Sequence, residues 1–227
     1  MREDVDEFED NKVEVRRDDR TIRKFFIPHQ ADITGALMKI TSYTRMNKGK
    51  EECNDCDFEI TKKHHLRIIG PNGIGKTTLL EKIATAKPED GIALHNDVRI
   101  GYYRQDFRGL DFNKTVYQEL ASVMPVLSEQ KLRSTAAGFL IDTALMNNKI
   151  GTLSEGQKGL VAFAQLVLLE PGLLVLDEPT NHINFRHLPV IAKALHDYEG
   201  GMIVISHDEE FMHDIRIDEM FDLAKQK

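Results

Sequence analysis

The chain has 227 residues, 41% of them hydrophobic, and a formal net charge of −7. This length fits one large domain, or one domain with an arm, and the hydrophobic fraction suffices for a full core. No apolar run reaches the roughly 20 residues of a membrane-spanning helix. The acidic balance does not favour nucleic acid in general, so we expect no DNA partner. The acidic N-terminus is not typical of a secretory signal, and two cysteines without a disulfide framework suit a reducing cytoplasm.

The first 30 residues differ in composition from the rest. Mixed charge dominates them up to Lys24, and an apolar run follows at residues 25–28. This pattern predicts a charged arm over residues 1–30, which docks by its last few residues onto a domain at 31–227. The arm's basic residues are Arg16, Arg17, Arg20, Arg23 and Lys24. A solvated arm explains them more simply than contact with RNA.

Alternating hydrophobicity predicts strands at residues 37–40 and 56–60. Cys53 and Cys56 form a lone C-x-x-C pair, and zinc would need a second pair, so we interpret them as core or loop cysteines. His64 and His65 lie beside two lysines, and we expect them in a surface turn. An apolar strand should follow that turn.

A glycine-rich segment follows this apolar strand and precedes a stretch with helical spacing. It fills every position of the pattern G-x-x-x-x-G-K-[ST]. Its residues are Gly70, Pro71, Asn72, Gly73, Ile74, Gly75, Lys76, Thr77 and Thr78. Glycines let successive backbone N–H groups point at one anion, Lys76 would neutralise the β- and γ-phosphates, and the Thr77 hydroxyl would ligate Mg²⁺. A chance glycine turn would not place a lysine and a hydroxyl in this order, so the segment predicts binding of a nucleoside triphosphate.

The rest of the chain alternates between strand and helix patterns. Two short strands are expected between residues 88 and 105, and residues 114–150 have helical spacing, with Ser128 as a predicted N-cap. The runs at 173–176 and 202–205 are almost continuously apolar, which is typical of parallel strands buried on both faces. We therefore predict an α/β fold with a buried parallel sheet.

Polar groups follow these two apolar runs, at the sheet edge where open α/β sheets bind ligands. Asp177 would hold Mg²⁺, Glu178 would polarise an attacking water, and His207 ends the next strand facing the same edge. Another segment precedes a helix, with Ser154 at the N-cap, and its N–H groups form a second anion site. That segment consists of Leu153, Ser154, Glu155, Gly156 and Gln157.

Together these motifs resemble the ATP-binding cassette (ABC) family over about residues 35–222. The phosphate loop, Gln105, the signature at 153–157, Asp177-Glu178 and His207 occur in the family's order. The run at 177–184, D-E-P-T-N-H-I-N, resembles the ABC-F form D-E-P-T-N-H-L-D. Three further segments are similar to the second, C-terminal cassette of ABC-F proteins: 156–158, 101–105, and 14–16 through 27–28.

The resemblance implies a P-loop NTPase fold of the ABC nucleotide-binding type. Its core sheet would be mixed, with an antiparallel β subdomain and a small helical subdomain at about residues 112–152. ATP and Mg²⁺ would be its ligands, and Thr77, Gln105 and Asp177 would hold the metal. Glu178 and His207 would be catalytic. Tyr43 is the nearest aromatic residue for stacking on adenine, although the family's spacing lies closer to Met46 or Asn47.

The resemblance also implies partners. ABC cassettes hydrolyse ATP as a sandwich, so residues 153–157 would bind the ATP of a second cassette. That cassette would be a second copy of this chain or the other half of a two-cassette protein. The arm resembles the end of an inter-cassette linker, which favours the interpretation of this chain as a fragment of a two-cassette protein. The ABC-F form implies a cytoplasmic ATPase that acts on the ribosome and its rRNA, as a translation factor or in protection from antibiotics.

The chain departs from the family at two positions, and three alternatives remain open. Glu155 stands where the signature usually has glycine, and we expect its carboxylate to point outward; Asn184 stands where aspartate is usual. An ATP-binding subunit of a membrane transporter is disfavoured by the run at 181–184. A DNA-repair ATPase would need a long coiled coil after Gln105. Glu178 and His207 argue against a non-enzymatic, nucleotide-gated module.

Overall fold

The computed structural model describes residues 20–225, except 48 and 86–90. Five strands form a central sheet in the order β5-β6-β7-β3-β8, and each neighbouring pair is parallel. Their bounds are His65–Ile69 (β3), Ile100–Tyr103 (β5), Leu173–Asp177 (β6), Gly201–Ile205 (β7) and Glu219–Asp222 (β8). A separate antiparallel sheet has the order β2-β1-β4, with bounds Met38–Asn47 (β1), Lys50–Ile60 (β2) and Ile92–Leu94 (β4). The predicted α/β fold and its antiparallel β subdomain are confirmed, but the core sheet differs from the mixed sheet predicted, because all neighbouring pairs among its described strands are parallel.

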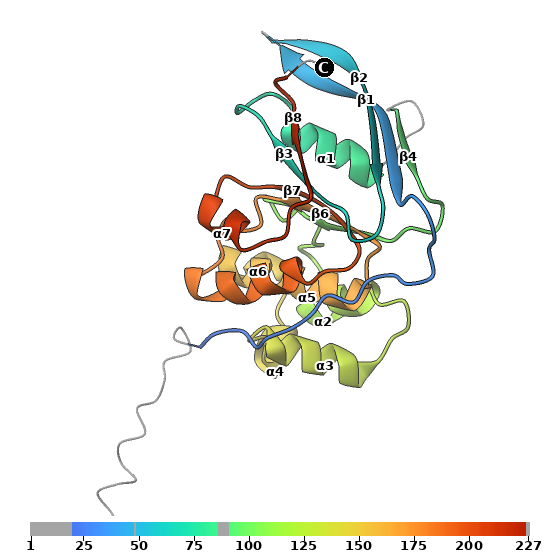
Figure 1. Ribbon diagram of the computed structural model, residues 1–227. Helices are drawn as coiled ribbons and strands as arrows, with labels where there is room; N and C mark the ends of the chain where they lie inside the picture. Colours follow the sequence, from blue (N-terminus) through green and yellow to red (C-terminus); the bar gives the residue numbers. More distant parts are fainter. Residues whose placement is uncertain (1–19, 48, 86–90, 226–227) are drawn as a thin grey trace, which may run out of the picture.

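Helices cover both faces of the central sheet (Figure 1). Helix α1 (Lys76–Thr85) lies between the two sheets, while α5 (Glu155–Leu169) and α6 (Leu188–His196) cover the opposite face. Every residue of β6 and β7 is buried as a result. This explains the two continuous apolar runs, because a strand with helices on both sides has no solvent-facing side chains.

A small helical layer packs beyond α5 (Figure 1). It contains α2 (Val116–Ser122), α3 (Glu129–Gly138) and α4 (Thr143–Met146). Ser128 is the N-cap of α3 as predicted, since its side chain accepts a hydrogen bond from Lys131 N–H. Leu120 and Leu132 are fully buried. These helices lie within the interval where the sequence predicts them.

The described part of the arm runs past the helical layer before it enters β1 (blue in Figure 1). Ile22 and Ile27 are buried, and the ring of Phe25 lies 4.7 Å from that of Phe139. Arg23 N–H donates to Gly138 O at 2.9 Å. Phe26 does not take part in this docking of the arm, because 71% of it is exposed. The basic pair Arg16-Arg17 lies outside the described residues.

His65 is fully buried, so its expected position in a surface turn is wrong. It is the first residue of β3, and its two ring nitrogens lie 2.9 Å from Arg216 O and 3.1 Å from Tyr198 O. Burial lowers the pKa of His65. Both partners lie more than 130 positions away along the chain, so no local pattern announces them. Cys53 and Cys56 both lie on β2, Cys53 exposed and Cys56 partly buried.

Candidate nucleotide-binding and catalytic site

The glycine-rich loop connects β3 to the first residue of α1. Gly73 and Gly75 have φ angles of 77° and 104°, in the region that favours glycine. Lys76 Nζ donates to Gly70 O at 2.8 Å and to Pro71 O at 3.3 Å, so the ammonium group lies within the curl of the loop. Backbone N–H groups at a helix N-terminus and a lysine cation together form a phosphate site.

A cavity of about 520 Å³ lies beside this loop. It is lined by Arg45, Met46, Asn47, Gly49, Pro71, Asn72, Gly73, Ile74 and Ala224. Met46 N–H donates to Ile74 O at 2.9 Å, which holds β1 against the loop. The position of this cavity fits a nucleoside whose phosphates extend into the loop.

Tyr43 does not line that cavity, which corrects its assignment as the residue nearest to the adenine. Only 5% of Tyr43 is exposed, and its ring packs edge-on against Phe221 at 5.1 Å. Tyr43 and Arg45 share the inward parity of β1, whereas Met46 turns outward. A base in the cavity would therefore lie against Met46 and Asn47, the positions that the family's spacing favours.

A second cavity, of about 400 Å³, opens at the carboxyl ends of β5 and β6. It is lined by Thr77, Tyr102, Arg104, Gln105, Asp106, Phe107, Glu155, Asp177 and His182. Thr77 and Asp177 both line this cavity, and their side chains interact there. Burial raises the pKa of Asp177, and the Thr77 side chain opposes that rise. A hydroxyl, a carboxylate and an amide oxygen are hard donors of the kind that Mg²⁺ accepts, so these residues fit the metal.

The described residues contain no group of three or more histidine, cysteine or acidic side chains that could enclose a metal ion. Mg²⁺ is usually held by one or two protein ligands, water and the phosphates of a substrate.

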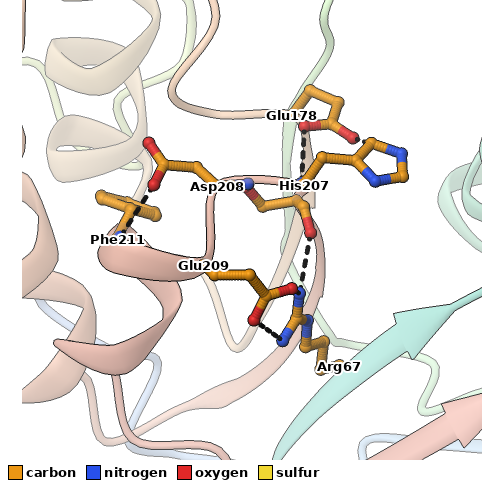
Figure 2. A network of polar contacts seen from close by, with 7 residues as sticks. Arg67, Glu178, His207, Asp208, Glu209 and Phe211 are labelled. Atoms are coloured by element: carbon orange, nitrogen blue, oxygen red, sulfur yellow. Dashed lines mark hydrogen bonds and ion pairs between the residues drawn. The ribbon is translucent and has the colours of Figure 1, made fainter.

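Glu178 and His207 meet at the ends of β6 and β7 (Figure 2). Glu178 Oε1 lies 3.4 Å from His207 Nε2, and Glu178 Oε2 accepts a hydrogen bond from His207 N–H at 3.2 Å. Glu178 itself is in the left-handed region, with φ of 49°, and its N–H donates to Ile205 O. The backbone thus fixes a nearly buried carboxylate beside an exposed imidazole, an arrangement suited to a general base.

The segment at 153–157 forms the start of α5. Ser154 is its N-cap as predicted, and the Ser154 and Gln157 side chains bond reciprocally to each other's backbone N–H. Glu155 Oε2 lies 2.8 Å from His182 Nδ1 of the same chain. Glu155 is the residue of this segment that lines the cavity containing Thr77 and Asp177.

Two arginines support the site, and sequence analysis missed both. Arg104 pairs with Glu81 of α1 at 2.5 Å and with Asp106 at 3.1 Å, which ties the phosphate helix to the turn that carries Gln105. Arg67 of β3 donates to Ser206 O at 3.1 Å and binds both carboxylate oxygens of Glu209 (Figure 2). Arg67 reaches the segment around His207 only after folding, because 142 positions separate it from Glu209 along the chain.

A parallel sheet with a glycine loop at a helix N-terminus, and with two acidic residues after a neighbouring strand, defines the class of P-loop nucleotide-binding domains. Within that class, residues 53–181 match the protein family described as ABC transporter. The chain belongs to this family.

Similar known proteins indicate the sub-family. The Bacillus subtilis protein YdiF, described as an ATP-binding protein, is 37% identical over 163 residues, which are 71% of this chain and 25% of YdiF. ATP-binding cassette sub-family F member 2 of Bos taurus is 32% identical over 197 residues, 84% of this chain and 31% of that protein. The chain thus resembles sub-family F and spans about a quarter to a third of these relatives' length.

A solved dimeric bacterial ABC transporter cassette superimposes with a TM-score of 0.63 at 18% identity, covering 84% of this chain and 96% of that one. At this identity, the likeness shows the fold alone. It confirms the ABC-type nucleotide-binding fold that the motifs predict.

We expect Arg67→Met to lower the turnover of ATP roughly tenfold or more while it leaves ATP affinity within about twofold, because a shift of about 1 Å in a catalytic group is enough for such a loss. Arg67 holds Ser206 O and Glu209, on either side of His207, but it does not line either cavity. Steady-state ATPase rates and a fluorescent ATP analogue measure the two quantities. Arg133→Met, which removes an exposed arginine paired with Glu129 on α3, is the matched control. Equal rates in the two variants would argue against a positioning role for Arg67.

Proposed function

We propose that this chain binds ATP with Mg²⁺ and hydrolyses it after a second cassette has closed over the nucleotide. The observation that carries the proposal is the meeting of Glu178 with His207 beside Thr77 and Asp177. Lys76 and the loop N–H groups hold the β- and γ-phosphates, and Glu178 accepts a proton from the attacking water. His207 lies within reach of the same water because its ring borders Glu178.

Thr77, Asp177 and Gln105 would hold the magnesium ion. When bound, Mg²⁺ neutralises charge that develops on the phosphate oxygens. The protein's own part is to place hard oxygen donors at the carboxyl end of β6, next to the loop that binds the phosphates.

The second cassette is required because residues 153–157 of each cassette would bind the ATP that the other cassette holds. The ATP on this chain's phosphate loop therefore needs the corresponding residues of a partner. The partner is a second copy of this chain or another part of a longer protein, since the chain spans about a quarter to a third of its relatives. In the proposed organisation, residues 1–30 are the end of a linker and 31–227 form the cassette, with a helical subdomain at about 112–152.

We further propose that the assembled protein acts on the ribosome. The support is the resemblance to sub-family F, in particular the run at 177–184. Arg20, Arg23 and Lys24 add exposed positive charge along the described arm, where rRNA phosphates would bind.

Ribosome co-sedimentation of the Glu178→Gln form tests this role. We expect more of the chain to sediment with ribosomes in the presence of ATP than with ADP or without nucleotide, because only ATP supports the closed sandwich. Glu178→Gln combined with Lys76→Ala is the control that cannot bind ATP. Equal sedimentation of Glu178→Gln with ATP, with ADP and without nucleotide, and of the double variant with ATP, would contradict the ribosomal role while leaving the ATPase assignment intact.

A membrane transporter subunit is the second candidate function. Val126 and Leu127, in the loop between α2 and α3, are 80% and 60% exposed, which favours docking of an apolar partner on the helical layer. None of the helices in the described part of the chain has the length and apolar character of a membrane crossing. Membrane fractionation decides between the candidates. If the chain is recovered in the membrane fraction, held there by a partner protein, the transporter role is supported.

A further inference from the structure

The N-terminus of α5 carries an acidic side chain at the point where an anion would bind. Helix α5 has 15 residues, and its first-turn N–H groups and dipole attract negative charge. Glu155 is the first residue of this helix. An ionised carboxylate placed over these N–H groups would compete with a phosphate for the same positive end and would repel it.

In the structure, the Glu155 carboxylate binds His182 instead. Glu155 Oε2 lies 2.8 Å from His182 Nδ1. The contact joins an acidic and a basic side chain across 27 positions of the chain. The nearest lysine on the helix, Lys158, points elsewhere, because its Nζ lies 5.0 Å from the centre of the Phe112 ring.

Close packing fixes the position of His182 relative to α5. A Cβ on Gly156 would lie 3.2 Å from His182 O, and one on Gly159 would lie 2.5 Å from Ile183 Cδ1. The first turns of α5 therefore rest directly on residues 182–183, and two glycines make this approach possible. On its other side, the His182 ring contacts Phe107, with ring centres 6.0 Å apart.

Resting on the proposed function, we infer that His182 is a positioning residue for the partner's ATP: it holds the Glu155 carboxylate away from the N-terminus of α5, so that this end can receive the phosphate of a nucleotide bound to the second cassette. His182 follows Glu178 by four positions in the connection between β6 and α6. The segment that carries the general base for one ATP thus also prepares the anion site for the other.

The test measures ATP-dependent association of the full chain by light scattering, with Glu178→Gln as the parent. We expect His182→Ala to raise the dissociation constant of the ATP-bound dimer about tenfold, since it frees a like charge beside a phosphate. His182→Asn should stay within about threefold, because the Asn side-chain amide can donate a hydrogen bond to the carboxylate and Asn tolerates the φ of 65° at this position. The decisive variant is Glu155→Gly combined with His182→Ala. It should associate as well as Glu155→Gly alone, because no carboxylate remains to be held.

A merely structural role predicts a different result. If His182 only supports the packing of α5, the double variant should stay as weak as His182→Ala, and that outcome would overturn the inference. So would a His182→Ala variant that associates like the parent. Titration with a fluorescent ATP analogue separates this inference from the proposed function: a parent that fails to bind the analogue would overturn both, whereas a parent that binds it and associates equally well with and without His182 would overturn this inference alone.

Discussion

Replacing Lys76 with alanine should lower the affinity for ATP roughly a hundredfold, since the loss of one partner in a close charge pair costs about 2–5 kcal/mol, and each 1.4 kcal/mol is a factor of ten. Lys76 Nζ lies within hydrogen-bonding distance of Gly70 O and Pro71 O, inside the curl where the β- and γ-phosphates would lie. The neighbouring loop N–H groups remain, so binding should weaken severely while the fold persists. Alanine also suits the first position of α1, because it has the highest helix propensity.

Titration with a fluorescent ATP analogue measures this effect. Lys193→Ala is the matched control, because Lys193 is an exposed helical lysine paired with Asp197 on α6. Thermal unfolding of both variants verifies that they are folded. An affinity that survives in Lys76→Ala would refute the assignment of residues 70–78 as the phosphate loop.

The Glu178→Gln variant should bind ATP normally but hydrolyse it about 100- to 10,000-fold more slowly, the usual range for loss of a general base. The amide keeps the shape of the side chain, and its oxygen can still accept the hydrogen bond from His207 N–H, which is 3.2 Å long in the structure. It cannot accept a proton from water. ATP should therefore remain between two cassettes, and a dimer should accumulate.

Single-turnover hydrolysis and light scattering with and without ATP measure the two effects. Glu210→Gln is the control, because Glu210 is exposed on α7 (Glu209–His213), close to the site but outside both cavities. If Glu178→Gln hydrolyses ATP at the parent rate, Glu178 is not the base. If it stays monomeric with ATP, the sandwich with a second copy is wrong, although a different second cassette would still be possible.

Local patterns predicted the structural elements well. The apolar runs at 173–176 and 202–205 are buried parallel strands, and Ser128 and Ser154 are N-caps. The loop at 70–78 leads from a strand to a helix, as its pattern requires. In each case the deciding interactions lie within a few residues: a hydroxyl bonds to an N–H three positions later, and glycines occupy left-handed backbone positions.

Long-range contacts account for the errors and the omissions. His65 was expected at the surface, yet Arg216 and Tyr198 enclose it. Tyr43 faces the core because of its parity on β1, and that parity depends on a register irregularity between Ile40 and Ser42 that spacing does not reveal. Arg104 had no motif of its own, although it joins α1 to the Gln105 turn.

Local sequence patterns indicate the chemistry: a loop that curls around phosphate, a lysine and a hydroxyl beside it, a strand followed by two carboxylates, and a capped helix that offers a second anion site. These features are encoded locally, by residue type and spacing. How these groups meet depends on the packing of the whole fold. Packing places His207 beside Glu178 and turns Glu155 toward His182. It also anchors the segment that carries His207, through the hydrogen bond from Arg67 to Ser206 O. Such pairs join residues that are distant in sequence, and their geometry arises only when the strands and helices pack together.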